Sequence, residues 1–346
     1  MARRVLWGSL SLAPITILLH YTADLGDTAD FVLAAAALIP LAWLIGEATE
    51  HAAHHTGPGI GGFLNATFGN APELIIALLA INQAKFEVVR GSLTGSVVGN
   101  LLLVLGFSLL FGGRGPVDRE SSFMSLGLVA LAVVFFLVPA IPSWSGDPER
   151  DLIVALSIPV SIALLVVYVC VTWYSLRRHR AMHATAEAPS SEVWSLALSL
   201  GVLGLATVVT ALIAEILIGS IETFAHNAHL SEFFVAAVIV AIVGNAAEHG
   251  GAVVVAARGN IKLAAEIALA SSAQVAVFLI PAVTLLGLLI DSLALAFRPV
   301  EIAAVGGSVL FTALLLRDGL SSRAKGVSLI AGYGVVALAF LVAGDR

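Results

Sequence analysis

The segments FGNAPELIIALLAI, at residues 68–81, and VGNAAEHGGAVVVA, at residues 243–256, decide the fold of this chain. Both are apolar, and both place a Gly-Asn step about one helical turn before a glutamate, Glu73 in the first and Glu248 in the second. Self-similarity within one chain is typical of proteins built from repeated structural units. The pair therefore predicts two related halves, each of which contributes one carboxylate.

The composition is that of a membrane protein. Hydrophobic residues make up 59% of the 346 positions and charged residues only 12%. The mean hydropathy is +1.01, whereas soluble domains are roughly half apolar and a quarter charged. Apolar runs near the ~20 residues that a helix needs to cross a bilayer recur along the whole chain. The sequence thus predicts a polytopic membrane protein and no nucleic-acid-binding surface.

Polar breaks divide the chain into about eleven apolar spans. These spans cover residues 5–22, 30–53, 61–83, 91–112, 122–142, 152–176, 193–219, 232–256, 261–290, 297–316 and 324–343. We expect an all-α bundle of about eleven transmembrane helices, in which one extra helix precedes two units of five. Because each unit crosses the membrane an odd number of times, the second unit enters the membrane inverted relative to the first.

The expected division has four parts: an extra helix, a first repeat, a cytoplasmic linker and a second repeat. They lie at residues 1–28, 29–176, 177–192 and 193–346. The linker, RRHRAMHATAEAPSSE, is polar and has no apolar periodicity. With the N-terminus in the cytoplasm, twelve Lys and Arg residues fall on the inner side and five on the outer side, as the positive-inside bias predicts. The outer five are Lys85, Arg90, Arg150, Arg298 and Arg346.

Glu73 and Glu248 carry the chemistry. Counted along their spans, both fall near the middle of the membrane. A carboxylate at that depth costs ~2.5 kcal/mol or more, and such residues normally face a cavity and mark an ion or proton pathway. One isolated glutamate could instead stay protonated and hydrogen-bond a neighbouring helix. Two glutamates at matched positions favour a transported ion.

The Gly-Asn steps at 69–70 and 244–245 predict a kink or break in each helix. Opening the backbone there frees carbonyl oxygens, which join the Asn amides and the two carboxylates in an all-oxygen environment suited to Ca²⁺. Pro72 strengthens the first break because it lacks an amide donor, whereas Ala247 predicts a milder second break. The glycines could also serve close helix packing alone.

The motifs GNAPE and GNAAEH resemble the signatures of the calcium/proton exchangers, a branch of the calcium/cation antiporter superfamily. The resemblance runs from about Leu44 to the C-terminus, and four further segments are similar to the family's helices around the cation pathway. They are GEATE (46–50), GSVVGN (95–100), AEILIGSIE (214–222) and SSAQ (271–274). The sodium/calcium exchanger branch carries Gly-Thr-Ser-X-Pro-Glu motifs, which this sequence lacks. That difference favours H⁺ over Na⁺ as the counter-ion.

The resemblance implies a set of site residues. The Ca²⁺ ligands, of which the glutamates also carry protons, are Glu73, Glu248, Asn70, Asn245 and the carbonyls of Gly69 and Gly244. The hydrogen-bonding residues around them are Ser96, Asn100, Ser271 and Gln274, and His249 adjoins Glu248 closely enough to modulate it. The residues at the entrances are Glu50, Glu215 and Glu222. Each polar residue could instead bond only a helix neighbour, and the entrance glutamates could be solvated charges.

The function implied by the resemblance is secondary active antiport of Ca²⁺ against H⁺ by alternating access, without enzymatic activity or an organic cofactor. We expect a bacterial cytoplasmic membrane protein with a cytoplasmic N-terminus, whose partners are the lipid bilayer and the two ions. The sequence does not determine the oligomeric state. The alternatives are a Na⁺/Ca²⁺ or broader divalent-cation exchanger, a passive channel, and an intramembrane metalloenzyme at His51 and His54. These histidines are three apart and lack the His-Glu-X-X-His order of metalloproteases.

Overall fold

The computed structural model describes most of the chain. It covers the backbone of residues 2–23, 25–182 and 194–346, and the side chains of these except 2–4, 57–63, 65–66, 175–182 and 247–248. The described part is all-helical, with one isolated β-bridge between Pro116 and Leu320. The expectation of an all-α fold is therefore confirmed for the described residues.

Nineteen helical elements follow one another along the described chain. Before the linker they are α1 (Ala2–Ser9), α2 (Leu12–Thr22), α3 (Asp27–Gly69), α4 (Ala71–Asn82), α5 (Phe86–Val98), η1 (Gly99–Val104), α6 (Leu105–Gly112), α7 (Arg119–Ser143) and α8 (Asp151–Met182). After it they are α9 (Leu196–Asn227), α10 (Glu232–Phe234), η2 (Val235–Val240), α11 (Ala241–Gly244), α12 (Ala246–Ala257), α13 (Ile261–Gln274), η3 (Val275–Leu279), α14 (Ile280–Gly287), α15 (Pro299–Leu316) and α16 (Arg323–Ala343).

Side-chain caps begin many of these helices, because the first amides of a helix have no partner within it. Each cap is a short polar side chain that accepts a hydrogen bond from the amide three residues later. The caps are Asp118, Ser195, Ser231, Asn260 and Ser322. Short polar residues at the ends of apolar runs thus set where several helices start.

The number of spans is close to the predicted eleven. In the described residues, nine helical segments are long and apolar enough to cross a membrane. A tenth forms if the bent pair Glu232–Gly244 and His249–Ala257 counts as one span. These elements give the chain the dimensions of a polytopic membrane protein.

The span expected at 61–83 does not form a helix of its own. Its first part belongs to α3, and its second part is the 12-residue helix α4. The chain therefore breaks at Asn70 and not near Pro58, where the boundary between spans two and three was expected. A continuous helix keeps backbone amides and carbonyls paired in an apolar surrounding, which a loop at Pro58 would not do.

Helix α8 reaches into the segment predicted as a linker, residues 177–192. Helix α8 continues to Met182, so the first residues of that segment extend the helix. The remainder, from residue 183, lies outside the described residues.

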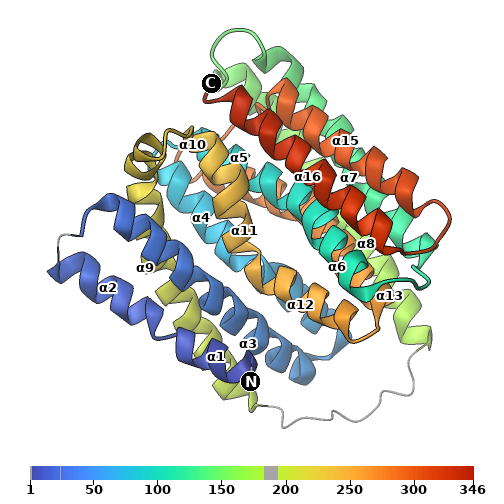
Figure 1. Cartoon of the computed structure of the whole chain (residues 1–346). Coiled ribbons are helices and arrows are strands. Elements are labelled where there is room, and N and C mark those ends of the chain that lie inside the picture. Colours follow the sequence, from blue (N-terminus) through green and yellow to red (C-terminus); the bar gives the residue numbers. More distant parts are fainter. Residues whose placement is uncertain (1, 24, 183–193) are drawn as a thin grey trace.

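The helices form two groups with the broken helices between them (Figure 1). Helix α3 packs along α9, and α2 packs on both, whereas α7, α8, α13, α14, α15 and α16 form the other group. Helices α4, α11 and α12 lie between the groups; α4 and α12 contact both, whereas α11 contacts α3 and α5. Glu73 lies on α4 and Glu248 on α12, so both motif glutamates belong to helices in the interior of the bundle.

The segments α5–η1–α6 and α13–η3–α14 run in opposite directions. A Cβ atom placed on Gly112, at the end of α6, would lie 2.7 Å from Cδ1 of Ile261, at the start of α13. One placed on Gly287, at the end of α14, would lie 3.1 Å from Cδ1 of Ile81, shortly before α5. Each segment thus begins at the end of the bundle where the other finishes, and each contains a π-helical turn.

Two glycines bring α5 against the second broken helix. A Cβ on Gly95 would lie only 2.0 Å from the carbonyl oxygen of Ala237, and one on Gly91 would lie 3.0 Å from Phe233. Small residues four apart allow this backbone approach between membrane helices. Close packing therefore accounts for these two glycines, and it positions α5 beside η2 and α11.

The two ends of the bundle carry different charges. The end that carries Lys85 is here called the Lys85 end, and it contains the five basic residues that were assigned above to the outer side. Two of them, Arg90 and Arg298, are buried among carboxylates. The opposite end, here called the Lys262 end, has exposed ion pairs such as Lys262–Asp118 at 2.9 Å. Hydrogen bonds from the Ser121 amide and from Lys262 hold the pKa of Asp118 below its ordinary value.

Candidate ion-binding site

Both Gly-Asn steps interrupt a helix at the asparagine. Asn70 lies between α3 and α4 with φ −100° and ψ 17°, and Asn245 lies between α11 and α12 with φ −90° and ψ 7°. Pro72 occupies the first turn of α4, where its missing amide costs no helical hydrogen bond. The breaks expected from the sequence are present, and the two share one backbone conformation.

The second break retains more helical hydrogen bonding than the first. The amide of Asn245 donates to the carbonyl of Ala241, four residues earlier, at 3.3 Å. The amide of Asn70 instead points to the carbonyl of Phe68, two residues earlier. Even so, the two arms of the second broken helix are bent by 56°. The second break thus keeps a backbone hydrogen bond that the first lacks, which agrees with the milder break expected from Ala247 in place of Pro72.

Glu73 lies against the second motif. Its side chain is buried, with the residue 7% exposed. A Cβ atom added to Gly244 would lie 3.4 Å from Cγ of Glu73 and 3.8 Å from its Oε1. The first motif's carboxylate therefore packs against the backbone of the second motif, although 171 positions separate the two residues in the sequence. Because Gly244 has no Cβ, no side-chain atom of residue 244 stands between its backbone and the carboxylate.

Two buried amides connect the break regions to the neighbouring helices. Nδ2 of Asn245 donates to Oγ of Ser96 at 2.7 Å and to the carbonyl of Ala241 at 2.8 Å. Nδ2 of Asn100 donates to Oγ of Ser271 at 3.0 Å. In the described part of the chain, Oδ1 of Asn245 and Oδ1 of Asn100 are buried without a hydrogen-bond partner. Buried oxygens of this kind are acceptors that a bound cation or water can satisfy.

The polar residues recur at equal spacing in the two halves. The number of positions from Asn70 to Asn245 equals the number from Ser96 to Ser271. The π-helical turn η1 begins three residues after Ser96, and η3 begins four residues after Ser271. Corresponding side chains thus occupy corresponding places in two antiparallel helical segments.

The remaining predicted ligands are placed only in part. Glu248 is the third residue of α12, but its side chain lies outside the described residues. His249 is half-buried, and its Nε2 has no partner within the described residues. Gly69 ends α3, and Gln274 ends α13 immediately before η3, where it is half-buried. Among the described side chains, no group of three or more His, Cys, Asp or Glu residues is arranged to hold a metal ion.

The expected entrance residues lie on the surface. Glu50 and Glu215 are exposed, and the Glu222 side chain is 74% exposed. Glu215 lines a cavity of about 300 Å³ together with Asp30, Gln83 and Ser220. Glu215 and Glu222 are about two turns apart on α9 and so share one face of that helix. None of the three is placed next to Glu73 by a described contact.

The histidines of the metalloenzyme alternative have other partners. His51 is buried and stacks on Trp194 with ring centroids 4.5 Å apart. Its Nδ1 accepts a long hydrogen bond of 3.4 Å from the Trp194 amide, and its Nε2 lies 3.6 Å from Glu47. His54 is exposed. His51 thus docks the start of the second half onto α3.

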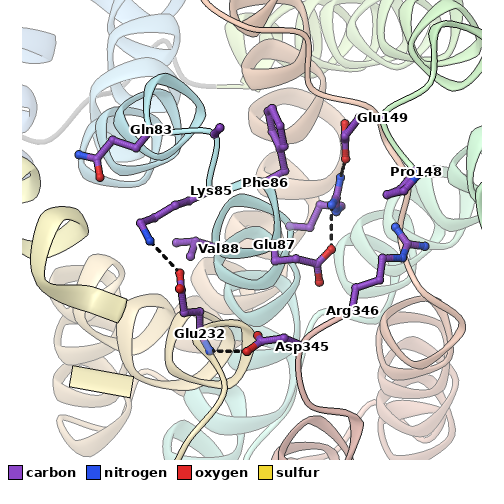
Figure 2. Close-up of a pocket in the computed structure, with 12 residues that line it drawn as sticks. Gln83, Lys85, Phe86, Glu87, Val88, Pro148, Glu149, Glu232, Asp345 and Arg346 are labelled. Atoms are coloured by element: carbon purple, nitrogen blue, oxygen red, sulfur yellow. Dashed lines mark hydrogen bonds and ion pairs between the residues drawn. The ribbon is translucent and has the colours of Figure 1, made fainter. Parts of the chain in front are cut away.

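A cluster of charges at the Lys85 end was not predicted from the sequence. Arg90 contacts Glu87 and Glu149, and Arg298 lies over the Phe233 ring at 3.7 Å. Glu301 is 1% exposed and accepts hydrogen bonds from Thr94 and from the Arg298 amide. Part of this cluster lines a cavity of about 630 Å³ (Figure 2). The only sequence signals were spacings of three residues, Glu87 to Arg90 and Arg298 to Glu301.

A family model described as "Sodium/calcium exchanger protein" matches residues 28–177 and 198–342. The chain belongs to this exchanger family. The matched segments contain both Gly-Asn breaks and leave out residues 178–197.

Curated relatives extend over nearly the whole exchanger chain. It is 35% identical to the Ca²⁺/H⁺ antiporter of Synechocystis sp., over 96% of this chain and 95% of the relative. It is 36% identical to the Ca²⁺/H⁺ antiporter ChaA of Bacillus subtilis, over 90% of this chain and 92% of the relative. The solved structure of the Ca²⁺/H⁺ antiporter protein YfkE is 31% identical and has a TM-score of 0.83, covering 98% of this chain and 99% of that one. The exchanger is therefore an integral membrane protein of the same fold.

Proposed function

We propose that this exchanger is a secondary active antiporter that moves Ca²⁺ against H⁺. The observation that carries the proposal is the burial of the Glu73 carboxylate against Gly244 of the second motif. The relatives of Synechocystis sp. and Bacillus subtilis, which match 96% and 90% of the chain, are themselves named Ca²⁺/H⁺ antiporters. The family consists of transporters, and we assign the chain no enzymatic activity.

The proposed Ca²⁺ ligands are the carboxylates of Glu73 and Glu248, with Asn70, Asn245 and the carbonyls of Gly69 and Gly244. The buried Oδ1 of Asn245 supports this set, because its amide nitrogen is already used by Ser96 and Ala241. Oxygen donors of these kinds suit a hard cation. Ser96, Asn100, Ser271 and Gln274 then orient the ligands from the neighbouring helices, and His249 modulates Glu248.

Competition for the same oxygens explains exchange. Two close carboxylates without a cation repel each other, so the pair takes up protons readily. Ca²⁺ neutralises both charges and expels the protons. A doubly charged empty site crosses the membrane poorly, since uncompensated buried charge is unfavourable. The site therefore changes its facing when it holds either Ca²⁺ or protons, and this couples the two fluxes.

The proposed architecture is an extra helix at 1–28, followed by inverted repeats at 29–176 and 193–346 joined by a linker at 177–192. Support comes from the antiparallel α5–α6 and α13–α14 segments and from the equal spacing of the Asn and Ser pairs. Inverted repeats commonly hold the substrate at their interface near the membrane midplane. Rocking of the α3–α9 group against the other helices would give alternating access.

We infer that the N-terminus and the Lys262 end face the cytoplasm, in the cytoplasmic membrane of a bacterium. The excess of Lys and Arg assigned to that end supports the orientation. The two buried arginines at the opposite end, Arg90 and Arg298, are paired with carboxylates, so they add little uncompensated charge there. The proposed partners are the lipid bilayer and the two transported ions, with no organic cofactor.

Inverted vesicles that contain the wild-type chain test the function. An imposed proton gradient, acidic inside, should drive uptake of ⁴⁵Ca²⁺, and a protonophore should abolish it. A Na⁺ gradient without a pH gradient should drive none. Uptake that follows the Na⁺ gradient would overturn the proton assignment and favour a Na⁺/Ca²⁺ exchanger. Uptake without proton counterflow would indicate a channel.

A further inference from the structure

Lys85 occupies the turn between α4 and α5 and bridges two other helices. Its Nζ lies 3.2 Å from Oε2 of Glu222, near the end of α9, and 3.1 Å from Oε2 of Glu232, the first residue of α10. Figure 2 shows the Lys85 and Glu232 side chains pointing toward each other. We call these two contacts the Lys85 bridge. It connects α9 to the α4–α5 turn and to the start of the second broken helix.

The two arms of the bridge differ in strength. The Glu222 side chain is 74% exposed, whereas that of Glu232 is 26% exposed. The start of α10 is fixed further by Asp345, whose carboxylate accepts hydrogen bonds from the amides of Glu232 and Phe233. Ion pairs that involve exposed side chains are weak. The Glu222 arm is therefore the one that separates first when α9 moves.

The charge of Lys85 is stable at physiological pH. Burial lowers its pKa, but the hydrogen bonds and charges of Glu232 and Glu222 outweigh this effect and raise the pKa above its ordinary value. A lysine with a raised pKa keeps its ion pairs below the ordinary pKa and loses them only as the pH rises through the raised value. Deprotonation of Lys85 therefore does not open the bridge at physiological pH.

Helices α9 and α3 are tied to each other at the same end. The rings of Phe31 and Phe224 stack with centroids 4.1 Å apart, and Oγ1 of Thr223 donates to Asp27 at 2.6 Å. Nδ2 of Asn227 donates to Oγ1 of Thr28 at 2.8 Å. All three contacts stay within the α3–α9 pair. These contacts hold α3 and α9 to each other, while Lys85 connects α9 to the α4–α5 turn and to α10.

The helices on the other side of the bridge are held more firmly. Arg90 of α5 is 2% exposed and contacts Glu87 and Glu149, and Arg298 contacts Glu301 and the Phe233 ring. Removing one member of a buried charge cluster of this kind is costly. The Lys85 end therefore has a rigid side around α5 and α10 and a side joined to it through an exposed carboxylate.

A cavity lies between α9 and the α4–α5 turn. It has a volume of about 300 Å³ and is lined by Asp30 of α3, Gln83 of the α4–α5 turn, and Glu215 and Ser220 of α9. Gln83 also lines the larger cavity that contains Lys85 (Figure 2). Separation of α9 from the turn would widen the first cavity along the face of α9.

We propose that Lys85 is a positioning residue for exchange: through Glu222 it holds the α3–α9 pair closed against the rigid side, and release of this arm opens the mouth at the Lys85 end. The inference rests on the proposed antiport. It adds the contact that controls whether the transport site opens at the Lys85 end. Glu222, expected from the sequence to lie at an entrance, then acts through Lys85 and not by binding the ion.

A cysteine-accessibility measurement tests the bridge. With Cys170→Ser as background, Ser220→Cys provides one reporter thiol, because Ser220 lines the cavity and is 4% exposed. The rate of reaction of the purified protein with a polar maleimide should rise about two- to five-fold in Lys85→Met and in Glu222→Gln, the range that a weak ion pair supports. Lys85→Arg should restore the wild-type rate.

Glu232→Gln is the matched control, since it removes the arm that does not reach α9. Its labelling rate should stay near that of the wild type. The positioning role of Lys85 would be overturned by an equal rise in labelling rate in Glu232→Gln and Glu222→Gln. It would also be overturned if the labelling rate did not rise in either Lys85→Met or Glu222→Gln. Proton-driven ⁴⁵Ca²⁺ uptake by the same background protein is measured in parallel. Its absence would overturn the proposed antiport, whereas normal uptake with unchanged labelling would overturn only the role of Lys85.

Discussion

The two Gly-Asn breaks have the same backbone conformation but different surroundings. At the second break, Asn245 is held by Ser96 and by its own helix through Ala241. Asn100, four residues after Ser96, adds a hydrogen bond to Ser271, whereas the residue four after Ser271 is Val275. The helices beside the two breaks therefore carry different side chains at one matched position, Asn100 in the first half and Val275 in the second. We expect the halves to bind and gate unequally.

The largest effect is expected when one carboxyl charge is removed at a time. Glu73→Gln and Glu248→Gln should each lower proton-driven ⁴⁵Ca²⁺ uptake by more than about 100-fold, because changes that only surround a metal site already cost about 10- to 100-fold. Glu120→Gln, at the exposed start of α7, is the control and should transport normally. Normal uptake in both site variants would refute the assignment.

A methyl group at Gly244 tests the contact between the two motifs. In Gly244→Ala, the new Cβ would lie 3.4 Å from Cγ of Glu73, which is ordinary contact, so the protein should fold. The methyl group would occupy space beside the carboxylate and lower uptake by about 10-fold or more. Gly204→Ala in α9 is the matched control, because an added Cβ there meets no atom within 4 Å. Wild-type uptake in Gly244→Ala would show that the ion does not bind beside this backbone.

Replacing Asn245 and Asn100 one at a time tests how much each buried amide contributes to the apparent Ca²⁺ affinity. Asn245→Ala deletes a proposed ligand and leaves Ser96 without its partner, so the apparent Ca²⁺ affinity should fall by about 10-fold. Asn100→Val reproduces the residue found in the second half; it removes the bond to Ser271 and the buried Oδ1 but none of the proposed ligands. Its affinity should fall by about two- to five-fold. A larger loss in Asn100→Val would reverse the proposed ranking of the two amides.

The smallest effect is expected from making the second break resemble the first. Ala247 is the second residue of α12, as Pro72 is of α4. Proline is tolerated in the first turn of a helix, because the amide that it lacks has no helical partner there. Ala247→Pro should fold and transport within about two-fold of the wild type. Loss of folding, seen as aggregation in size-exclusion chromatography, would show that the two breaks are not interchangeable.

Much of the fold followed from local sequence. Apolar runs of membrane length predicted most of the helices, and the Gly-Asn steps predicted both breaks, because glycine and proline act within their own turn. The continuation of α3 past Pro58 was missed, since the backbone's need for internal hydrogen bonds in an apolar environment outweighed the local signal. The π-helical turns η1 and η3 had no sequence signal that we recognised.

The site was predictable only where residue types repeat. Asn70, Glu73 and Ser96 have counterparts at one constant spacing, so they could be selected from the sequence together with those counterparts. The Lys85 bridge could not, because its partners lie 137 and 147 positions away and meet only after the helices pack. The contact of Glu73 with Gly244 is likewise tertiary. Sequence periodicity identifies candidates, and packing decides which of them meet.

Proton release on Ca²⁺ binding tests the central claim most directly. Purified protein in weakly buffered detergent solution is titrated with Ca²⁺ at a series of pH values while the released protons and the affinity are measured. Competition at two carboxyls predicts weaker binding at lower pH, release of at most about two protons per Ca²⁺, and a smaller release in Glu73→Gln and in Glu248→Gln. Ca²⁺ binding that is independent of pH and releases no protons would contradict the account.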